Sequence, residues 1–234
     1  MKDEQEPKAV AERYARRADG DRYSASRPEV RHWLAERQRA LLALLGARER
    51  AGLDVVEVGC GSGGNLQELL SLGFTPERLQ GIELLPERLA QARAVLPPAL
   101  RLIEGDASVV PVGPSSQDIV VASTVFSSLL DADFQQRLAD AMWAWLKPGG
   151  AVLWYDFTVN NPRNPDVRGV PLARVHALFP QATITHHRVT LAPPLARAVC
   201  RIHPGLYGVF NRLPLLRTHV LAWVEKPAAG PRAG

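Results

Sequence analysis

A run of glycines is the part of this sequence whose residue types and spacing could do chemistry. The run, Gly59-Cys60-Gly61-Ser62-Gly63-Gly64, follows a short β-branched segment at 53–58 and precedes leucines at helical spacing. Glycine permits a sharp turn from strand to helix, and the missing Cβ lets a ligand approach the backbone at the positive end of that helix. The sequence therefore predicts a cradle for a small ligand.

Three acidic residues accompany the glycine run. Glu57 stands two residues before the first glycine, Glu83 ends an apolar segment, and Asp106 follows another. A carboxylate at the end of a strand can bind hydroxyl or amino groups of a ligand, or it can cap the next helix. Gly59, Gly61 and Gly64 also satisfy the dinucleotide pattern, in which an acid about 20 residues later binds a ribose. The loop and its acids alone leave NAD open as the ligand.

The elements that must position these residues alternate between strand and helix. This alternation predicts a doubly wound α/β domain with a mostly parallel sheet. The expected strands are 53–58, 79–83, 100–103, 118–122 and 151–156, and the C-terminal part adds strands at 182–189 and 218–225. We expect one domain over 1–234, made of a helical preface at 1–50, a ligand-binding core at 51–156, a C-terminal part at 157–226 and a disordered tail at 227–234.

Composition and charge narrow the class of protein. Apolar residues make up 46% of the chain and no run is long enough to span a bilayer, while the acidic N-terminus does not look like a secretory signal. We therefore expect a cytoplasmic protein whose two cysteines are free thiols. Residues 52–135 hold four arginines against eleven acids, so the two ends carry the positive excess of the +4 chain. That excess indicates an anionic partner or an arginine-rich composition.

Two further motifs decide between the ligands. Gly105-Asp106-Ala107 follows the third expected strand, and Lys147-Pro148-Gly149-Gly150 precedes the fifth. Together with Glu57, the glycine run and Glu83, they resemble the class I S-adenosylmethionine-dependent methyltransferase family, in the same order, over residues 54–156. The resemblance implies a Rossmann-like methyltransferase fold with an antiparallel C-terminal strand and an N-terminal helical lid.

The same resemblance implies a cofactor site for S-adenosylmethionine, with S-adenosylhomocysteine as the product. In it Glu83 takes the ribose hydroxyls, and Asp106 and Ala107 bind the adenine. The complete set of implied cofactor contacts is Glu57, Gly59, Cys60, Gly61, Gly63, Glu83, Leu84, Asp106, Ala107 and Ser123, with Tyr14 and Tyr23 from the lid.

The acceptor pocket of this topology lies over the carboxyl ends of the fourth and fifth strands. Asp156 is the candidate general base there, with His176 on the following helix behind it. No metal-binding pattern is present. The segment after Asp156 is dense in hydrogen-bonding side chains that suit hydroxyl-rich or anionic groups, although it can equally be a turn-rich connector. The substrate-binding candidates are Asn160, Asn161, Arg163, Asn164 and Arg168.

These features favour an O-methyltransferase that acts on a hydroxyl-rich, anionic small molecule or glycan end. A weaker resemblance, carried by 21–24 and 191–197, is to small bacterial methyltransferases of polysaccharide or natural-product clusters. The alternatives are an RNA methyltransferase, an aromatic natural-product O-methyltransferase and a noncatalytic cofactor-binding protein. Ala122-Ser123-Thr124-Val125 stands where DNA amino-methyltransferases carry Asn-Pro-Pro-Tyr, so no DNA partner is expected.

An apolar stripe in the C-terminal part has two interpretations. It is flanked by arginines, and we expect it to cover the acceptor pocket; peripheral contact with a membrane surface is the less favoured alternative. The stripe consists of Leu195, Val199, Ile202, Leu206 and Phe210, and the arginines are Arg197, Arg201 and Arg212.

Overall fold

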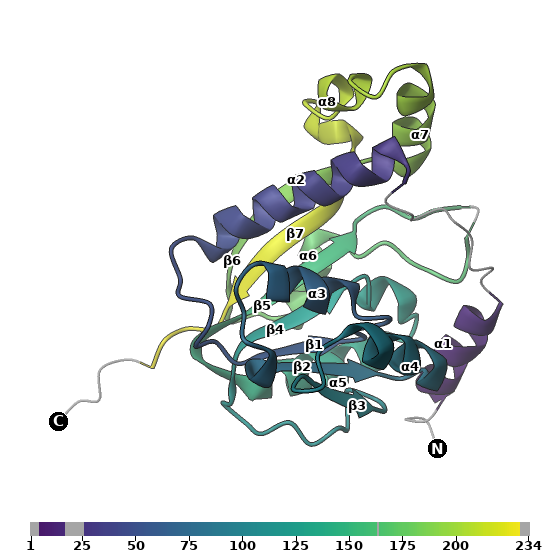
Figure 1. Cartoon of the computed structure of the whole chain (residues 1–234). Helices are drawn as coiled ribbons and strands as arrows, with labels where there is room; N and C mark the ends of the chain where they lie inside the picture. Colours follow the sequence, from purple (N-terminus) through teal and green to yellow (C-terminus); the bar gives the residue numbers. More distant parts are fainter. Residues whose placement is uncertain (1–4, 17–25, 163, 230–234) are drawn as a thin grey trace.

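The computed structural model describes residues 5–16, 26–162 and 164–229 (Figure 1). Its centre is a seven-stranded sheet of order β3-β2-β1-β4-β5-β7-β6. The first five strands are parallel, whereas β7 is antiparallel to both β5 and β6. The predicted doubly wound, mostly parallel sheet with an antiparallel C-terminal strand is confirmed. The strands are β1 Val55–Val58, β2 Leu79–Glu83, β3 Arg101–Glu104, β4 Gln117–Ser123, β5 Leu146–Phe157, β6 Thr183–Leu191 and β7 Arg217–Glu225.

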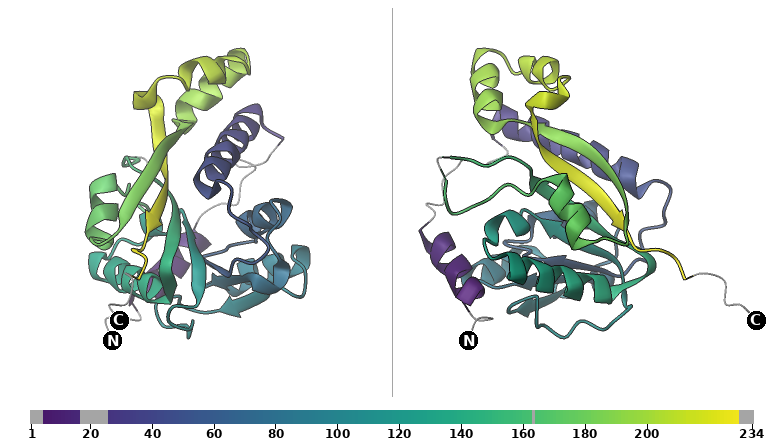
Figure 2. Two further views of the ribbon diagram at one scale, coloured as in Figure 1. Left: turned by 90° about the vertical axis from the view of Figure 1, so that its left-hand side faces the viewer. Right: turned by 180° about the vertical axis from the view of Figure 1, so that it is seen from behind.

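Helices cover both faces of the sheet (Figure 2). One face packs against α2, α3 and α4, and the opposite face against α5 and α6. Three short 3-10 turns connect elements: η2 Pro76–Arg78, η3 Phe126–Ser128 and η4 Pro214–Leu216. The helices are α1 Gln5–Ala15, α2 Pro28–Leu45, α3 Gly64–Ser71, α4 Pro86–Val95, α5 Ala132–Trp145, α6 Leu172–Leu178, α7 Pro193–Ile202 and α8 Leu206–Phe210.

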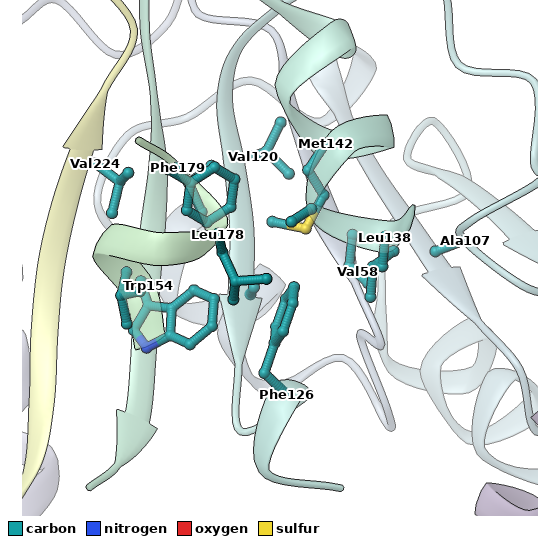
Figure 3. Close-up of a cluster of buried hydrophobic side chains, with 14 of the residues drawn as sticks. Val58, Ala107, Val120, Phe126, Leu138, Met142, Trp154, Leu178, Phe179 and Val224 are labelled. Carbon is teal, nitrogen blue, oxygen red and sulfur yellow. The ribbon is translucent and has the colours of Figure 1, made fainter. Parts of the chain in front are cut away.

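The larger core lies between the sheet and the α5–α6 layer (Figure 3). The ring of Trp154 on β5 lies 4.5 Å from that of Phe126 on η3 and 6.4 Å from that of Phe179 after α6, measured between centroids. All three side chains are at most 2% exposed. Aromatic burial of this kind is the strongest apolar contribution that a side chain makes to stability. This packing fixes η3 just beyond the carboxyl end of β4.

The fifth strand begins earlier than the sequence predicts. It starts at Leu146 rather than residue 151, because Leu146 pairs with Gln117 of β4. The Lys-Pro-Gly-Gly segment forms the irregularity before pairing with β4 resumes at Ala151, and its Gly149 N–H donates to the carbonyl oxygen of Lys226. The Nζ of Lys147 lies 2.9 Å from a carboxylate oxygen of Asp54 and 2.7 Å from one of Asp118. A Cβ on Gly150 would lie 2.9 Å from the carbonyl oxygen of Asp118, so only glycine allows this close approach. The motif therefore joins β1, β4 and β5 at their amino ends.

The helical preface divides into two parts with different positions. Helix α2 packs on the sheet through Leu41, Leu44 and Leu45 and contacts β6 and β7, so it does not lie over the glycine run. Helix α1 instead contacts the carboxyl edge of the sheet. There Arg13 donates to the carbonyl oxygen of Ser128 at 2.9 Å. Only α1 therefore has the position of the expected lid.

The predicted helical stretch at 195–210 is two helices, α7 and α8, which are separated around Pro204. Its apolar stripe is not continuous. Val199 is buried, but Ile202 is 79% exposed because α7 ends there and the chain turns away from the core. Among the described residues, no helix is long and apolar enough to cross a membrane.

Candidate functional site

The glycine loop between β1 and α3 has the backbone that the sequence predicts. Gly59 and Gly61 have φ of +62° and +56°, in the left-handed region that favours glycine. A Cβ on Gly61 would lie 2.8 Å from Nη2 of Arg88, and one on Gly59 would lie 3.0 Å from Cγ2 of Val125. Side chains at these positions would fill the cradle. The loop is therefore shaped for close approach of other groups to its backbone.

The carboxylate of Glu83 holds this loop to the end of β2. It is 4% exposed, and its two oxygens accept hydrogen bonds from the backbone N–H of Gly61 at 2.7 Å and of Leu85 at 3.0 Å. Each carboxylate oxygen retains a second lone pair. Glu83 can therefore brace the loop and accept ligand hydroxyls at the same time.

Glu57, on β1, has a buried carboxylate of which only one oxygen has a hydrogen-bond partner among the described residues. Its Oε1 accepts a 2.6 Å hydrogen bond from the side-chain amide of Asn65, while Oε2 is buried with no hydrogen-bond partner in the described chain. Burial raises the pKa of Glu57 to about 7, and the hydrogen bond from Asn65 opposes that rise. A buried acceptor without a donor is costly, so this oxygen is suited to a cationic group of a ligand.

Helix α1 closes the open side of the loop through a stacked pair. The guanidinium of Arg88, on α4, lies 5.1 Å from the centre of the Tyr14 ring and against Gly61. The helix is anchored by Glu6, which accepts from Arg13 at 2.6 Å and from the backbone N–H of Leu130 at 2.7 Å. Tyr14 therefore lies near the glycine loop, as a lid contact would; Tyr23 is outside the described residues.

The remaining expected cofactor contacts lie along the same edge. Asp106 follows β3, and its Oδ1 accepts from the backbone N–H of Ser108, so it caps a turn with one oxygen. Ala107 is buried in the larger core, and Leu84 is partly exposed beside Glu83. Burial raises the pKa of the Cys60 thiol, which keeps it protonated and makes it a packing residue rather than a nucleophile.

A shallow hollow with only about 30 Å³ of water-accessible space lies between α2, α3 and the carboxyl halves of β4 and β5, and Asn65, which lines it, donates to Glu57. Arg37 crosses it: its guanidinium pairs with Glu68 at 2.5 Å and lies 5.4 Å from the centre of the Tyr155 ring. Apolar side chains from β4, β5 and β7 form its floor. The complete lining is Arg37, Leu41, Asn65, Glu68, Leu69, Val121, Ser123, Leu153, Tyr155 and Leu221.

Asp156 faces away from this hollow. Side chains alternate along a strand, so Tyr155 points to the hollow and Asp156 to the opposite face. Its oxygens accept from the backbone N–H of Ser127 and of Phe157, both at 2.9 Å, and burial raises its pKa to about 7. His176 is exposed on α6. No hydrogen bond between described residues joins His176 to Asp156.

In the segment after β5, Asn160 and Asn164 form hydrogen bonds with the backbone of the same segment. Asn160 accepts from the N–H of Gly169 at 2.9 Å, and Asn164 accepts from that of Asp166 at 3.2 Å. Asn161 and Arg168 are exposed, and Arg163 lies outside the described residues. Asp166 pairs with Arg16 beyond the end of α1 at 3.0 Å. The segment is thus a structured connector tied to α1, with Arg168 available on its surface.

Comparisons with known proteins agree with this geometry. A family model for a methyltransferase domain matches residues 55–150. The trans-aconitate 2-methyltransferase of Afipia carboxidovorans is 32% identical over 154 residues, which are 65% of this chain and 54% of that protein. The match thus spans about half the length of that relative.

Solved structures share the fold at low sequence identity. An S-adenosylmethionine-dependent methyltransferase from Mesorhizobium loti has a TM-score of 0.60 at 17% identity, covering 85% of this chain and 98% of that one. A methyltransferase in complex with the activator Trm112 of Haloferax volcanii has a TM-score of 0.62 at 21% identity, covering 93% and 97%. Residues 55–150 thus match a methyltransferase domain, and the chain has the fold of class I S-adenosylmethionine-dependent methyltransferases.

The cofactor of this family is S-adenosylmethionine, and the residues of this methyltransferase fit it. The cofactor carries a ribose with two hydroxyls, for which Glu83 has free lone pairs, and an ammonium group at its amino-acid end, for which Glu57 has its unpartnered oxygen. Gly61 leaves room against the backbone. No group of three or more metal-ligating side chains gathers in the part of the chain that the structure describes.

Several residues of this methyltransferase site were not predicted from the sequence. Asn65 reaches back across the glycine loop to Glu57, and Arg37 and Glu68 meet from different helices. Thr124, directly after β4, has φ of +55°, which is unusual for a β-branched residue and often marks a functional position. Two features of the sequence could have indicated them: the polar Asn65 directly after the glycine run, and Arg37 among the apolar positions of α2.

The first prediction concerns cofactor choice. Glu83→Ala should weaken S-adenosylhomocysteine binding by about 1.5–3 kcal/mol, the usual contribution of hydrogen bonds to a charged group. Calorimetry measures the affinity. The matched control is Glu87→Ala, because Glu87 is exposed in the first turn of α4, the helix that follows Glu83. The wild-type protein should not bind NAD. Tight NAD binding, or equal affinities of the Glu83 variant and the wild type, would contradict the assignment.

The second prediction concerns Glu57 and pH. Its raised pKa means that the carboxyl group is largely protonated in the free protein below about pH 7. A cationic group at Oε2 lowers that pKa, so cofactor binding near pH 6.5 should release protons, and the affinity should fall as pH drops. Calorimetry in buffers of different ionisation enthalpy measures this release. Glu57→Gln should abolish that contribution; proton uptake by the wild type would refute the role.

Proposed function

We propose that this methyltransferase transfers the methyl group of S-adenosylmethionine to an oxygen of a polar, anionic small molecule or glycan end. The observation that carries the proposal is the shallow hollow where Arg37, Asn65, Ser123 and Tyr155 meet at the carboxyl ends of β4 and β5. Arginine binds carboxylate or phosphate groups through paired donors. The hollow is thus suited to an acceptor with both polar and charged groups.

Methyl transfer from a sulfonium requires few catalytic groups from the protein. The bound cofactor supplies a methyl group on a sulfonium, which needs no further activation; the acceptor oxygen forms the new bond and S-adenosylhomocysteine leaves. The chain's own residues align the acceptor, exclude water and remove a proton where the oxygen carries one. Glu68, the carboxylate that lines the hollow, is held in an ion pair with Arg37. An oxygen that is already ionised, as in a carboxylate or phosphate, suits this site.

The comparison with known proteins supports the same acceptor class. The relative from Afipia carboxidovorans is named for trans-aconitate, an organic acid. Incubation with S-adenosylmethionine labelled in its methyl group and fractionated cell extract tests the proposal. The label should enter acidic small molecules or an acidic glycan fraction, and Glu83→Ala should slow labelling at subsaturating cofactor. Label in RNA, or in neutral aromatic compounds only, would overturn it.

A third prediction identifies how the acceptor is held. We propose that Arg168 and Arg163, in the segment after β5, contact the charged group of the acceptor. Arg168 is exposed, and its backbone N–H donates to the carbonyl oxygen of Ser127 on η3. Arg168→Lys should raise the acceptor KM several-fold and leave cofactor affinity unchanged, since lysine cannot copy the paired donors. Arg101→Lys, an exposed arginine on β3, is the control. An unchanged KM for Arg168→Ala would exclude this contact.

A fourth prediction concerns Asp156, which we propose to be a positioning residue that holds η3 through Ser127. Asp156→Asn replaces one accepting oxygen by an N–H₂ group, so activity should fall while the pH dependence of kcat keeps its wild-type shape. The pH profile, at saturating cofactor, is the measurement. If Asp156 were the general base, kcat would rise through about pH 7, the variant would lose this limb, and turnover would fall roughly 10²–10⁴-fold.

A further inference from the structure

The unit formed by α7, α8 and η4, residues 193–216, projects beyond the end of the sheet (Figures 1 and 2). It has a small core of its own, made of Ala196, Val199, Cys200 and Tyr207, to which Leu191 and Trp33 of α2 contribute. This core accounts for the inward side chains of the unit. The outward side chains are left to contact something else.

Large apolar side chains are exposed on this unit to an unusual degree. Leu215 is 92% exposed, Ile202 79%, Val209 59% and Leu213 56%. In the rest of the described chain, only three other large apolar residues are comparably exposed, and they are widely separated: Val95, Val109 and Val159. Single exposed apolar residues are common, but four within 14 residues mark an interaction surface.

The charge along this stretch of sequence has one sign, and Glu36 of α2 contacts Tyr207 and Arg217 at the base of the unit. Residues 167–224 contain seven arginines and no aspartate or glutamate. Arg197, Arg201 and Arg212 are exposed, and no ion pair in the described part of the chain involves them. The unit therefore combines protruding apolar side chains with arginines that have no acidic partner among the described residues.

We propose that the unit 193–216 docks on an anionic lipid bilayer surface. Apolar side chains that enter the acyl boundary, flanked by arginines at headgroup level, are the combination by which short amphipathic helices bind such surfaces. A second copy of the chain would bring the same positive charge to the contact and is repelled. A nucleic acid would use the arginines but offers nothing that requires Leu215 and Ile202 to protrude.

The place of the unit in the fold relates this surface to the methyltransferase site. Strand β6 runs parallel to β5, because both pair antiparallel with β7. Helix α7 follows the carboxyl end of β6, so the unit stands at the same edge of the sheet as the glycine loop. Docking would hold that edge towards the bilayer.

Sedimentation with vesicles tests the proposal on the full chain. The wild type should bind vesicles of phosphatidylcholine with phosphatidylglycerol, bind phosphatidylcholine alone much more weakly, and lose binding as salt is added. Leu215→Glu and Ile202→Glu should each lower the partition roughly tenfold, and Arg201→Gln or Arg212→Gln roughly fivefold. Val95→Glu, at the end of α4, should leave it unchanged.

Three results would overturn the proposal: no binding to the anionic vesicles at low salt, equal binding of wild type and Leu215→Glu, or binding of single-stranded RNA in preference to vesicles. Because Leu215 and Ile202 lie outside the core, thermal melting should show that both variants remain folded. Vesicle binding needs neither cofactor nor acceptor, so its failure would leave the proposed methyl transfer standing.

Discussion

The hydrogen bonds from Gly61 and Leu85 to the buried carboxylate of Glu83 are the constraint on which the site depends. They join the glycine loop after β1 to the start of the helix after β2, across two neighbouring parallel strands. Each oxygen of this carboxylate accepts one backbone N–H and retains a lone pair for a further donor. The side chain of Glu83 thus fixes the shape of the glycine loop and also presents acceptor oxygens for a ligand.

The local parts of this arrangement could be predicted from the sequence, and the long-range parts could not. The bounds of β2, 79–83, follow from its apolar pattern and the flanking turns. The start of β5 does not, because Lys147-Pro148-Gly149-Gly150 has turn composition. It belongs to the strand only through the pairing of Leu146 with β4 and the backbone hydrogen bonds of Gly149 and Gly150 with Lys226. The contact of Asn65 with Glu57 likewise depends on how far the glycine loop folds back.

Two adjacent residues of β5, Tyr155 and Asp156, point to opposite faces of the sheet and therefore have different contacts. Topology places both Tyr155 and Asp156 at the carboxyl end, and an acid there suggests a base. The two-residue period instead turns Tyr155 to the hollow with Arg37, and Asp156 to η3. Acidic residues of the core hold the loop and the turns, while Arg168, Arg197, Arg201 and Arg212 are exposed on the surface.

The most direct test of this account is a crystal structure of the chain with S-adenosylhomocysteine. The account predicts both ribose hydroxyls within hydrogen-bond distance of Glu83, the ligand's amino group at Oε2 of Glu57, and the guanidinium of Arg88 moved off Gly61 or stacked on the ligand. A ligand bound away from the glycine loop, or a Glu83 carboxylate that contacts only backbone N–H groups, would contradict it.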